Sequence, residues 1–344
     1  MADRVGVSRA TVSNAYNRPD QLSPDLRARI LAAAQELGYA GPDPAARGLR
    51  RGRTGTVGIL LGEPLDYAFT DPAAVLFLEG LAGALPATLG SNLLVIPSPP
   101  GADPSAAVRD AVVDAFVAYC IGDGHPTLRA ALDRRVPTVL IEGPSTPGAS
   151  AVDIDQREGG RLAAEHVARL GHRRVGILAD RLNLDGFAGW VTEERLATAT
   201  EPVTRDRVLG FREGLAAGGV DPLSAPIHEG ANIRAEALQR ARAMLAEQPD
   251  LTAIVAGSDV LALAVLDAAA EAGRDVPGDL SVTGFDDIPA AGQARPPLTT
   301  VRQSLGDKGR AAVTLLADLV GGGEPRQIVL PLELIVREST APPR

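Results

Sequence analysis

The sequence predicts an α/β protein in which a small all-α segment precedes a large, two-lobed core of doubly wound sheets. Two observations indicate this architecture. From Thr56 onward, short apolar runs alternate with Ala-rich helical stretches, which is typical of parallel sheets covered by helices. Residues 1–54 instead carry two short, capped helical patterns. At 344 residues, the chain has room for both parts.

The first helical pattern covers residues 7–17. Ser8 can act as its N-cap, because a serine hydroxyl accepts a hydrogen bond from the free amides of the first turn. Val12 and either Ala15 or Tyr16 fall on one face of this helix, which we expect to be buried.

A second helix is predicted to begin at Ser23-Pro24-Asp25. Serine caps a helix, proline fits its first position, and an acidic residue favours the positive end of the helix dipole. Gly38 is placed to end it. Its expected apolar face consists of Leu26, Ile30, Ala33 and Leu37. Residues 39–48 are rich in Pro and Gly and predict a linker, with room for a short helix at Pro44–Leu49.

The core is predicted to begin with a strand at Val57–Leu61, followed by a helical stretch near Ala73–Leu85. Further strands are expected at 93–96, 116–121, 137–141, 175–179, 253–256 and 280–284. Helical, Ala-rich segments lie between most of them, so we expect two similar lobes.

The composition argues against a membrane protein and a disulfide-bonded one. Hydrophobic residues make up 45% of the chain, so a large core is expected. No run of about 18 apolar residues is found, and the N-terminus lacks the apolar stretch of a signal peptide, so we expect a cytoplasmic protein. The single cysteine, Cys120, ends an apolar run and is predicted to be a buried, inert strand residue.

The charge is distributed unevenly along the chain. The whole chain carries a net charge of −9, which by itself argues weakly against nucleic-acid binding. Residues 1–54, however, hold nine Arg and five acidic residues and so carry +4, which leaves −13 on the remainder. A basic head on an acidic body suits a protein that touches phosphate with one end only.

The N-terminal helices have the features of a helix-turn-helix. Gly6-Val7-Ser8 supplies the tight turn, and Arg9, Ala10 and Asn14 supply an exposed face at the start of the following helix. Arginine suits the paired acceptors of guanine, and asparagine suits the edge of adenine. Short hydrogen-bonding residues suited to phosphate are Ser8, Thr11, Ser13 and Asn17. The spacing alone fits an ordinary capped surface helix equally well.

Several ordered motifs resemble those of one protein family. GVSRATVSNAYN followed by LSPDLRARILAAAQELGY resembles the DNA-binding head of the LacI family, and Pro44–Leu49 resembles its hinge helix. Core segments similar to the family's motifs follow at Leu170–Val175, Ser281–Asp287, Pro297–Gln303 and Arg337–Thr340. The resemblance covers nearly the whole chain. It implies a helix-turn-helix domain at 1–40, a hinge at 41–55, and a periplasmic-binding-protein-like (type I) core at 56–344.

The resemblance also assigns roles in the head. It places Arg9, Ala10 and Asn14 at the base-reading positions. It places Leu49 at the hinge position that wedges between bases in the minor groove, although a small contact within the linker is the alternative. The partners that it implies are an operator DNA with a pseudo-palindromic sequence, a small-molecule effector, and a second copy of the chain in a homodimer or a tetramer.

The first helix of the head is shorter than in the family. Only Ala2–Val5 stands before the turn, and a head without most of this helix should be poorly folded. We therefore hypothesise a misassigned start, with the natural chain beginning about eight residues upstream, or two helical turns. The function that the resemblance implies is a sequence-specific transcriptional repressor whose operator affinity is controlled by a small polar effector of the sugar or nucleoside class. The alternative function is a cytoplasmic small-molecule sensor of the same core fold, with DNA binding impaired by the short first helix.

An effector site is expected at the carboxyl ends of the core strands, where doubly wound folds bind ligands. The resemblance places Arg207 and Asp286 in contact with an effector, and a carboxylate with an arginine and aromatic neighbours can grip a sugar or a nucleoside. The full set of expected effector residues is Phe69, Thr70, Trp190, Arg207, Ser258 and Asp286. An interlobe salt bridge is the alternative for Arg207 with Asp286, and a packed surface aromatic is the alternative for Trp190.

The resemblance further implies that the lobes exchange segments. One lobe should take 56–153 and a segment around 287–320, and the other should take 154–286 and the C-terminal end.

The sequence does not predict an enzyme. It has no phosphate-binding loop of the Walker type, no G-x-S-x-G, and no His or Cys cluster with metal-ligand spacing, so we expect no cofactor and no metal. The rival class is an exported solute-binding protein with the same core, which would need a signal peptide and no head.

Overall fold

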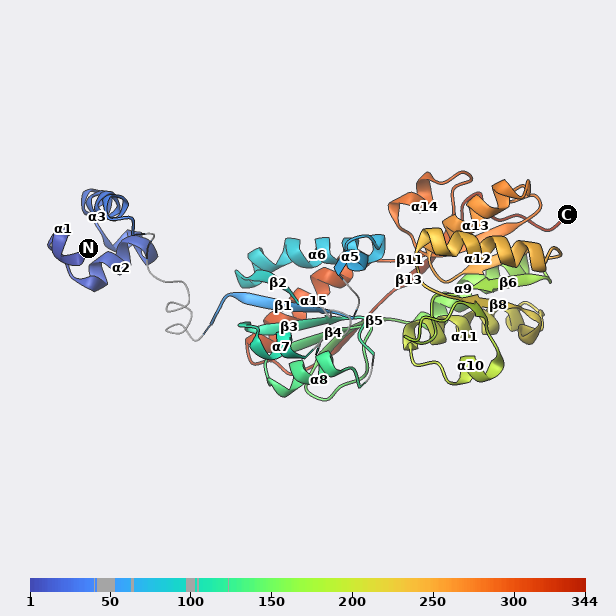
Figure 1. Cartoon of the computed structure of the whole chain (residues 1–344), viewed down its shortest axis with the longest axis horizontal. Coiled ribbons are helices and arrows are strands. Elements are labelled where there is room, and N and C mark those ends of the chain that lie inside the picture. The colour runs from blue at the N-terminus through green and yellow to red at the C-terminus, as the bar shows by residue number, and fades with distance from the viewer. Residues whose placement is uncertain (40, 42–52, 63–64, 97–102, 104, 123) are drawn as a thin grey trace. The chain divides into compact units, whose positions relative to one another are not determined.

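The computed structural model describes residues 1–39, 41, 53–62, 65–96, 103, 105–122 and 124–344. These residues form two compact units: Met1–Gly55 with Val112–Asp114, and the rest of the chain from Thr56 (Figure 1). The helix expected at Pro44–Leu49 lies outside the described residues.

The N-terminal unit contains a small bundle of helices. They are α1 (Ala2–Val5), α2 (Arg9–Asn17), the 3-10 turn Pro19–Gln21, and α3 (Pro24–Glu36). Both predicted caps are confirmed, because Ser8 accepts from the Thr11 amide and Ser23 accepts from the Leu26 amide. The buried apolar core of this unit is small and includes Val12, Ala15 and Ile30.

The predicted apolar face of α3 needs two corrections. Ala34 rather than Ala33 is buried beside Ile30, and Leu37 is 48% exposed. The helix ends at Glu36, and Gly38 follows with φ +62°, a left-handed conformation that turns the chain away. Leu37 therefore no longer shares the helical face on which the sequence pattern placed it.

The first lobe of the core is built on a parallel sheet with strand order β12-β5-β4-β3-β1-β2. Its strands are β1 (Thr56–Leu61), β2 (Asn92–Ile96), β3 (Ala115–Tyr119), β4 (Thr138–Ile141), β5 (Ser150–Ile154) and β12 (Gln327–Leu330). Its helices are α5 (Leu65–Ala68), α6 (Pro72–Leu89), α7 (Ala106–Asp110), α8 (Pro126–Asp133) and α15 (Leu305–Val320). The predicted doubly wound arrangement is therefore confirmed for this lobe.

The second lobe has a sheet of order β13-β11-β10-β9-β6-β8-β7, antiparallel only at its two edges. Its strands are β6 (Val175–Leu178), β7 (Gly189–Trp190), β8 (Ile227–Glu229), β9 (Ala253–Ala256), β10 (Ser281–Asp286), β11 (Thr299–Gln303) and β13 (Leu332–Ile335). Its helices are α9 (Gln156–Arg169), α10 (Glu193–Ala197), α11 (Pro202–Ala217), α12 (Arg234–Glu247), α13 (Asp259–Glu271) and α14 (Pro289–Gln293).

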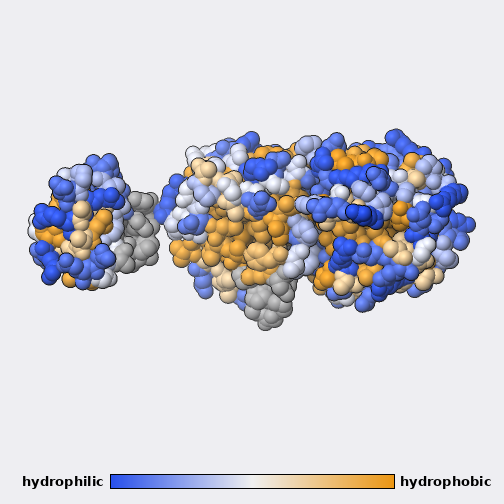
Figure 2. Space-filling model, turned by 90° about the horizontal axis from the view of Figure 1, so that it is seen from above, coloured by the Kyte–Doolittle hydropathy of each residue, from blue (hydrophilic) through white to orange (hydrophobic). Residues whose placement is uncertain are grey.

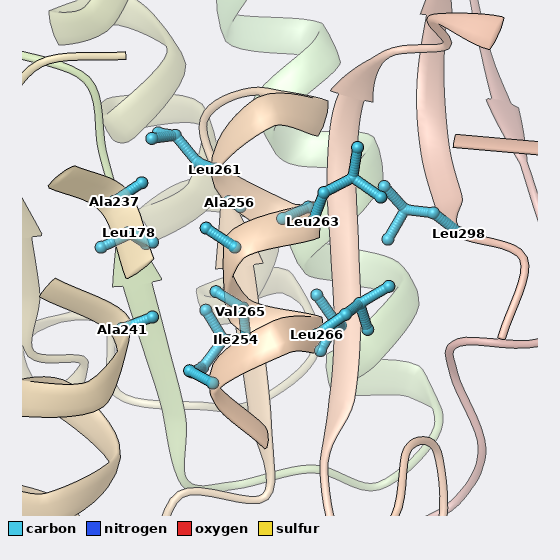
Figure 3. Packing of buried hydrophobic residues seen from close by; sticks show 14 of the residues in the cluster. Leu178, Ala237, Ala241, Ile254, Ala256, Leu261, Leu263, Val265, Leu266 and Leu298 are labelled. Carbon is cyan, nitrogen blue, oxygen red and sulfur yellow. The ribbon is translucent and has the colours of Figure 1, made fainter. Parts of the chain in front are cut away.

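Small aliphatic side chains fill the core of the second lobe. Figure 3 shows Leu178 and Ile254 on the central strands meeting Leu261 and Val265 of α13, with Ala237 of α12 beside them. Because aromatic residues are rare in the chain, this interdigitation of Ala, Leu, Val and Ile does most of the packing.

The chain crosses between the lobes at three points within residues 124–344, which are described without a gap: after β5, after β11 and after β12. The predicted boundary near 287 is therefore wrong. Residues 287–303, with α14 and β11, stay in the second lobe, and the chain returns to the first lobe only at Ser304. Strand β11 stays because it pairs with β10 and β13.

Helix α6 departs from the expectation that no run could span a membrane. By length and composition alone, it is long and apolar enough to cross a membrane. One side of the helix, with Phe77, Leu81 and Leu85, is buried in the first lobe against β-strands and α15. Figure 2, which views the first lobe from the side of α6, shows apolar residues gathered on that face.

Candidate functional site

A cavity of about 150 Å³ lies at the carboxyl ends of the strands of both sheets. Leu61 and Tyr119 end strands of the first sheet there, and Asp286 and Gln303 end strands of the second. Five carboxylates line the cavity, from Asp71, Glu142, Asp180, Glu201 and Asp286. Of the arginines that the structure describes, only Arg181 and Arg207 line it, and polar side chains such as those of Tyr67, Asn232 and Ser258 line it too.

Arg207 is held rigidly against the second lobe. Its guanidinium lies over the Phe285 ring, 3.6 Å from the centroid, and its Nε donates to Gln156 Oε1 at 3.0 Å. Another of its nitrogens donates to the Gly257 carbonyl. The residue is only 9% exposed. These contacts fix the orientation in which the Arg207 guanidinium faces the cavity.

Glycines bring α11, the helix that carries Arg207, close to α9. A Cβ on Gly160 of α9 would overlap the Arg207 carbonyl, and one on Gly210 of α11 would overlap the Arg157 carbonyl. Since only glycine leaves room for this approach, the spacing of the two backbones depends on these two positions.

Asp286 ends β10 at a left-handed φ of +113° and accepts a hydrogen bond from Gln303 Nε2 at 2.6 Å. Burial raises its pKa to about 7, while Arg207 and Gln303 act in the opposite direction. Burial likewise raises the pKa of Asp180 to about 6. Two of the cavity carboxylates therefore titrate close to neutral pH.

Arg207 and Asp286 do not form the interlobe salt bridge that was the alternative for them. Both belong to the second lobe, on α11 and β10, and among the described residues no ion pair joins them. Of the expected effector residues, Arg207, Ser258 and Asp286 line the cavity together. The hydroxyl of Ser258 caps α13 and lies 2.6 Å from Asn232 Oδ1.

Phe69, Thr70 and Trp190 are not among the residues that line the cavity, so their role in effector binding stays a prediction. Phe69 is 57% exposed, and the Thr70 hydroxyl donates to the Tyr67 carbonyl. Tyr67 of α5 and Asp71, which follows that helix, line the cavity instead. Trp190 lies on edge strand β7, where its ring packs 4.9 Å from that of His228 and its Nε1 donates to Glu247. It is the packed surface aromatic that the alternative described.

Cys120 is also placed differently from the prediction. Strand β3 ends at Tyr119, and Cys120 follows in a left-handed conformation with φ +50°. It lines the cavity, and its thiol donates to Glu142 Oε2 at 3.4 Å. The apolar run continues past the end of the strand, so the pattern alone could not show where the strand stops.

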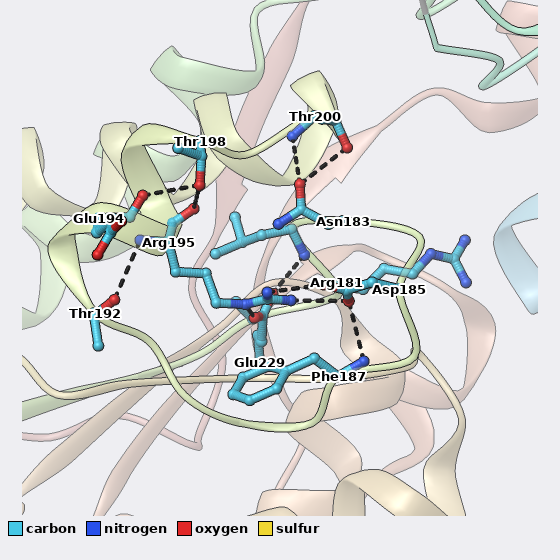
Figure 4. A network of polar contacts seen from close by, with 12 residues as sticks. Arg181, Asn183, Asp185, Phe187, Thr192, Glu194, Arg195, Thr198, Thr200 and Glu229 are labelled. Carbon is cyan, nitrogen blue, oxygen red and sulfur yellow. Dashed lines mark hydrogen bonds and ion pairs between the residues drawn. The ribbon is translucent and has the colours of Figure 1, made fainter.

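The segment between β6 and α11 is shaped by a polar network (Figure 4). Arg195 forms ion pairs with Asp185 and with the fully buried Glu229, and it stacks over the Phe187 ring at 4.1 Å. Glu229 also accepts from the Leu182 amide at 2.6 Å. The ends of this segment, Arg181 and Glu201, are thereby held at the cavity wall.

A chain of hydrogen-bonded polar side chains lies behind the part of the cavity wall that Glu142 and Gln303 form, and we call this chain the cavity floor. Lys308 of α15 is fully buried and donates to Glu142 Oε1 at 2.7 Å and to Gln303 Oε1. Gln156 donates to Glu142 Oε1 at 2.8 Å. Lys308 keeps the pKa of Glu142 below its ordinary value although burial acts to raise it. Sequence reasoning missed these residues, since Glu142 and Lys308 lie far apart along the chain.

The helix α2 of the N-terminal unit presents the expected DNA-reading residues. Ser8, Arg9 and Ala10 are exposed, and Asn14 is partly exposed with its amide 3.5 Å from Gln21 Oε1. The small polar residues also serve the helix itself, because the Ser8 and Thr11 hydroxyls lie 2.9 Å apart and Asn17 donates to the Ser13 carbonyl. Leu49 lies outside the described residues.

Comparisons with known proteins agree for both units. Residues 1–41 match the model of the bacterial regulatory proteins of the lacI family, and residues 164–340 match the periplasmic binding protein-like domain. The HTH-type transcriptional regulator Rv3575c of Mycobacterium tuberculosis is 43% identical, over 100% of this chain and 96% of that protein. The regulator IpsA of Corynebacterium glutamicum is 42% identical, over 92% and 89%.

Solved structures give the same result. A LacI-family transcriptional regulator from Corynebacterium glutamicum has a TM-score of 0.75 at 37% identity, covering 99% of this chain and 97% of that one. The regulator CelR in complex with cellobiose has a TM-score of 0.71 at 29% identity, with 98% of each chain covered. The lac repressor dimer bound to operator and the anti-inducer ONPF has a TM-score of 0.78 at 25% identity, covering 99% and 97%.

Proposed function

Since the chain belongs to the LacI family of bacterial regulatory proteins, we propose that it represses transcription and that a small polar effector in the cavity controls its affinity for an operator. That it is a DNA-binding transcriptional regulator follows from the family. The observation that carries the effector site is the meeting of Arg207, Ser258 and Asp286 at one cavity between the sheets.

The lining favours a neutral, hydroxyl-rich effector of the sugar or nucleoside class. Among the described residues, five carboxyl groups against two guanidinium groups supply hydrogen-bond acceptors for hydroxyl donors. The structure of the regulator CelR contains cellobiose, which is a ligand of this chemistry.

A thermal-shift screen of sugars, polyols and nucleosides against the full chain tests the effector site. A ligand at about 100 times its Kd should stabilise the folded state by about 2.7 kcal/mol. Asp286→Ala should abolish the shift and the effector response while leaving operator affinity largely intact, because the ligand's donors lose their acceptor. Asp267→Ala, on the exposed side of α13, is the matched control. A normal response in Asp286→Ala would refute the assignment.

For the DNA, we propose a pseudo-palindromic operator bound by a homodimer in the cytoplasm. One head reads only a few base pairs, so two heads are needed for useful affinity. The residues proposed to contact DNA are Ser8, Arg9, Ala10, Thr11, Ser13, Asn14, Asn17 and Leu49. An electrophoretic shift with the promoter upstream of the gene tests this, and unshifted promoter DNA at micromolar protein would contradict it.

A further inference from the structure

Two side-chain amides of the cavity floor connect Asp286 and Arg207, the proposed effector residues, to the charged groups Lys308 and Glu142 of the other lobe. Glu142 and Lys308 belong to the first lobe. The second lobe contributes Gln156 with its partner Arg207, and Gln303 with its partner Asp286. Lys308, Gln303 and Gln156 are buried, at 0%, 6% and 8% exposure, and the side chain of Glu142 is 7% exposed. Lys308 itself does not line the cavity, so it would act only through other residues.

In the chain from Lys308 through Gln303 to Asp286, Lys308 determines which end of the Gln303 amide faces Asp286. An ammonium group has no acceptor, so Gln303 must turn its carbonyl oxygen toward Lys308, as it does. The amide nitrogen of Gln303 then faces Asp286 and donates to Oδ1 at 2.6 Å. The buried cation thereby orients an amide that donates to the carboxylate.

In the chain from Glu142 through Gln156 to Arg207, the amide points the other way. Glu142 accepts from the amide nitrogen of Gln156 at 2.8 Å. The carbonyl oxygen of Gln156 is left to accept from two nitrogens of Arg207. Glu142 thereby orients the Gln156 amide so that its oxygen accepts from Arg207. The two members of the Lys308–Glu142 ion pair thus orient one amide each.

We propose that Lys308 is a positioning residue: its ion pair with Glu142 locks the side-chain amides of Gln303 and Gln156 and so holds Asp286 and Arg207 in the arrangement that receives the effector. The effector role of Asp286 and Arg207 rests on the function proposed above. The locking itself is a property of the free protein, and it ties the first lobe to the ligand-binding groups of the second.

The locking makes a measurable difference to Asp286. While Lys308 holds the amide, Gln303 can donate to the ionised carboxylate but cannot turn to accept from the protonated one. Without Lys308, the amide can rotate and accept from the protonated form, which stabilises that form and raises the pKa of Asp286. We expect a rise of about 1, the size of one hydrogen bond.

The test follows the carboxyl carbon of Asp286 by NMR in the full, ligand-free chain with ¹³C-labelled aspartate, assigned with Asp286→Asn. The key variant is Lys308→Met with Glu142→Gln, which removes both charges together and leaves no unpaired buried charge. It is made with Gln303 present and again with Gln303→Met. The control is the exposed pair Arg234→Met with Asp267→Asn, which should leave the pKa of Asp286 unchanged.

The proposal expects the pKa of Asp286 to rise when the pair is removed in the presence of Gln303, and to change little when Gln303→Met is already present. Equal rises in both backgrounds would show that the pair acts through its electric field alone and would overturn the proposal, as would no rise in either. Because no ligand is used, a failed effector screen leaves this test intact, and failure here leaves the effector site standing.

Discussion

At the scale of single residues, burial decides the charge state of the cavity. Asp286 and Asp180 both have pKa values raised by burial, to about 7 and about 6. Asp259 lies close to Asp286, is fully buried, and has a pKa well above its ordinary value because of burial and because of Asp286. A site of this kind holds protons at neutral pH that a solvent-exposed carboxyl group would release.

The raised pKa of Asp286 makes a prediction about stability. The folded state binds this proton more tightly than the unfolded chain, so the stabilising contribution is present below the ordinary value of 3.8 and is lost as pH rises through about 7. Asp286→Asn cannot ionise. Its free energy of unfolding relative to the natural protein should therefore increase between about pH 4 and about pH 7, as measured by urea unfolding. A difference that stays constant with pH would contradict the raised pKa.

Arg9 is exposed at the start of α2 and makes the second residue-scale prediction. Arg9→Ala should weaken operator binding by about 1–3 kcal/mol and weaken binding to random DNA much less, because a paired contact to guanine carries sequence information. Titration of both DNAs by fluorescence anisotropy measures the two losses. Equal losses would identify Arg9 as a phosphate contact instead.

At the scale of elements, the close pairing of α9 with α11 positions Arg207. Gly160 and Gly210 allow the two backbones to touch, and Gln156 at the start of α9 receives the Arg207 guanidinium. A similar approach joins α6 and α15, where a Cβ on Gly309 would overlap the Leu81 amide. Both helices that carry buried cations of the site are thus placed by glycine contacts.

Gly160→Ala should separate α9 from α11. The added methyl group cannot be accommodated against the Arg207 carbonyl, so we expect a loss of stability of about 1–3 kcal/mol and a weaker effector response. Gly83→Ala, in α6, is the matched control, since a Cβ there meets nothing within 4 Å and alanine favours a helix. Chemical unfolding of both variants gives the comparison. Equal stability of the two would show that the α9–α11 spacing can relax.

At the scale of the whole molecule, three crossings within residues 124–344 join the lobes, and residues of both lobes line the cavity. Glu142 follows β4, Gln156 begins α9, and Gln303 ends β11, so two of the crossings carry residues of the cavity floor. A ligand that contacts both lobes can therefore change their relative position, which is the coupling that effector control requires.

Leu49→Ala tests the coupling between effector and DNA. A six-residue hinge helix is too short to be stable alone, so we expect it to form only when two heads are on DNA, with Leu49 wedged at the central step. The variant should keep effector affinity but lose operator affinity and DNA bending together. Calorimetry and a circular-permutation gel shift measure the three quantities. Unchanged operator affinity would mean that each head acts as a tethered reader.

The sequence by itself determined the features that depend on neighbours in the chain. The caps Ser8 and Ser23 were predictable because capping is a local hydrogen bond, and the main core strands were predictable from their apolar runs. The family motifs also located Arg207 and Asp286, which the structure brings to one cavity.

Only the tertiary structure decided the rest of the cavity. Lys308 and Glu142 are 166 residues apart, and their meeting depends on where α15 returns to the first lobe after β11. Tyr67 of α5 lines the cavity, whereas Phe69, just after that helix, lies outside it, although the two are close in sequence. Which buried polar groups face one another is determined by the packing of distant segments, and no local pattern in the chain records it.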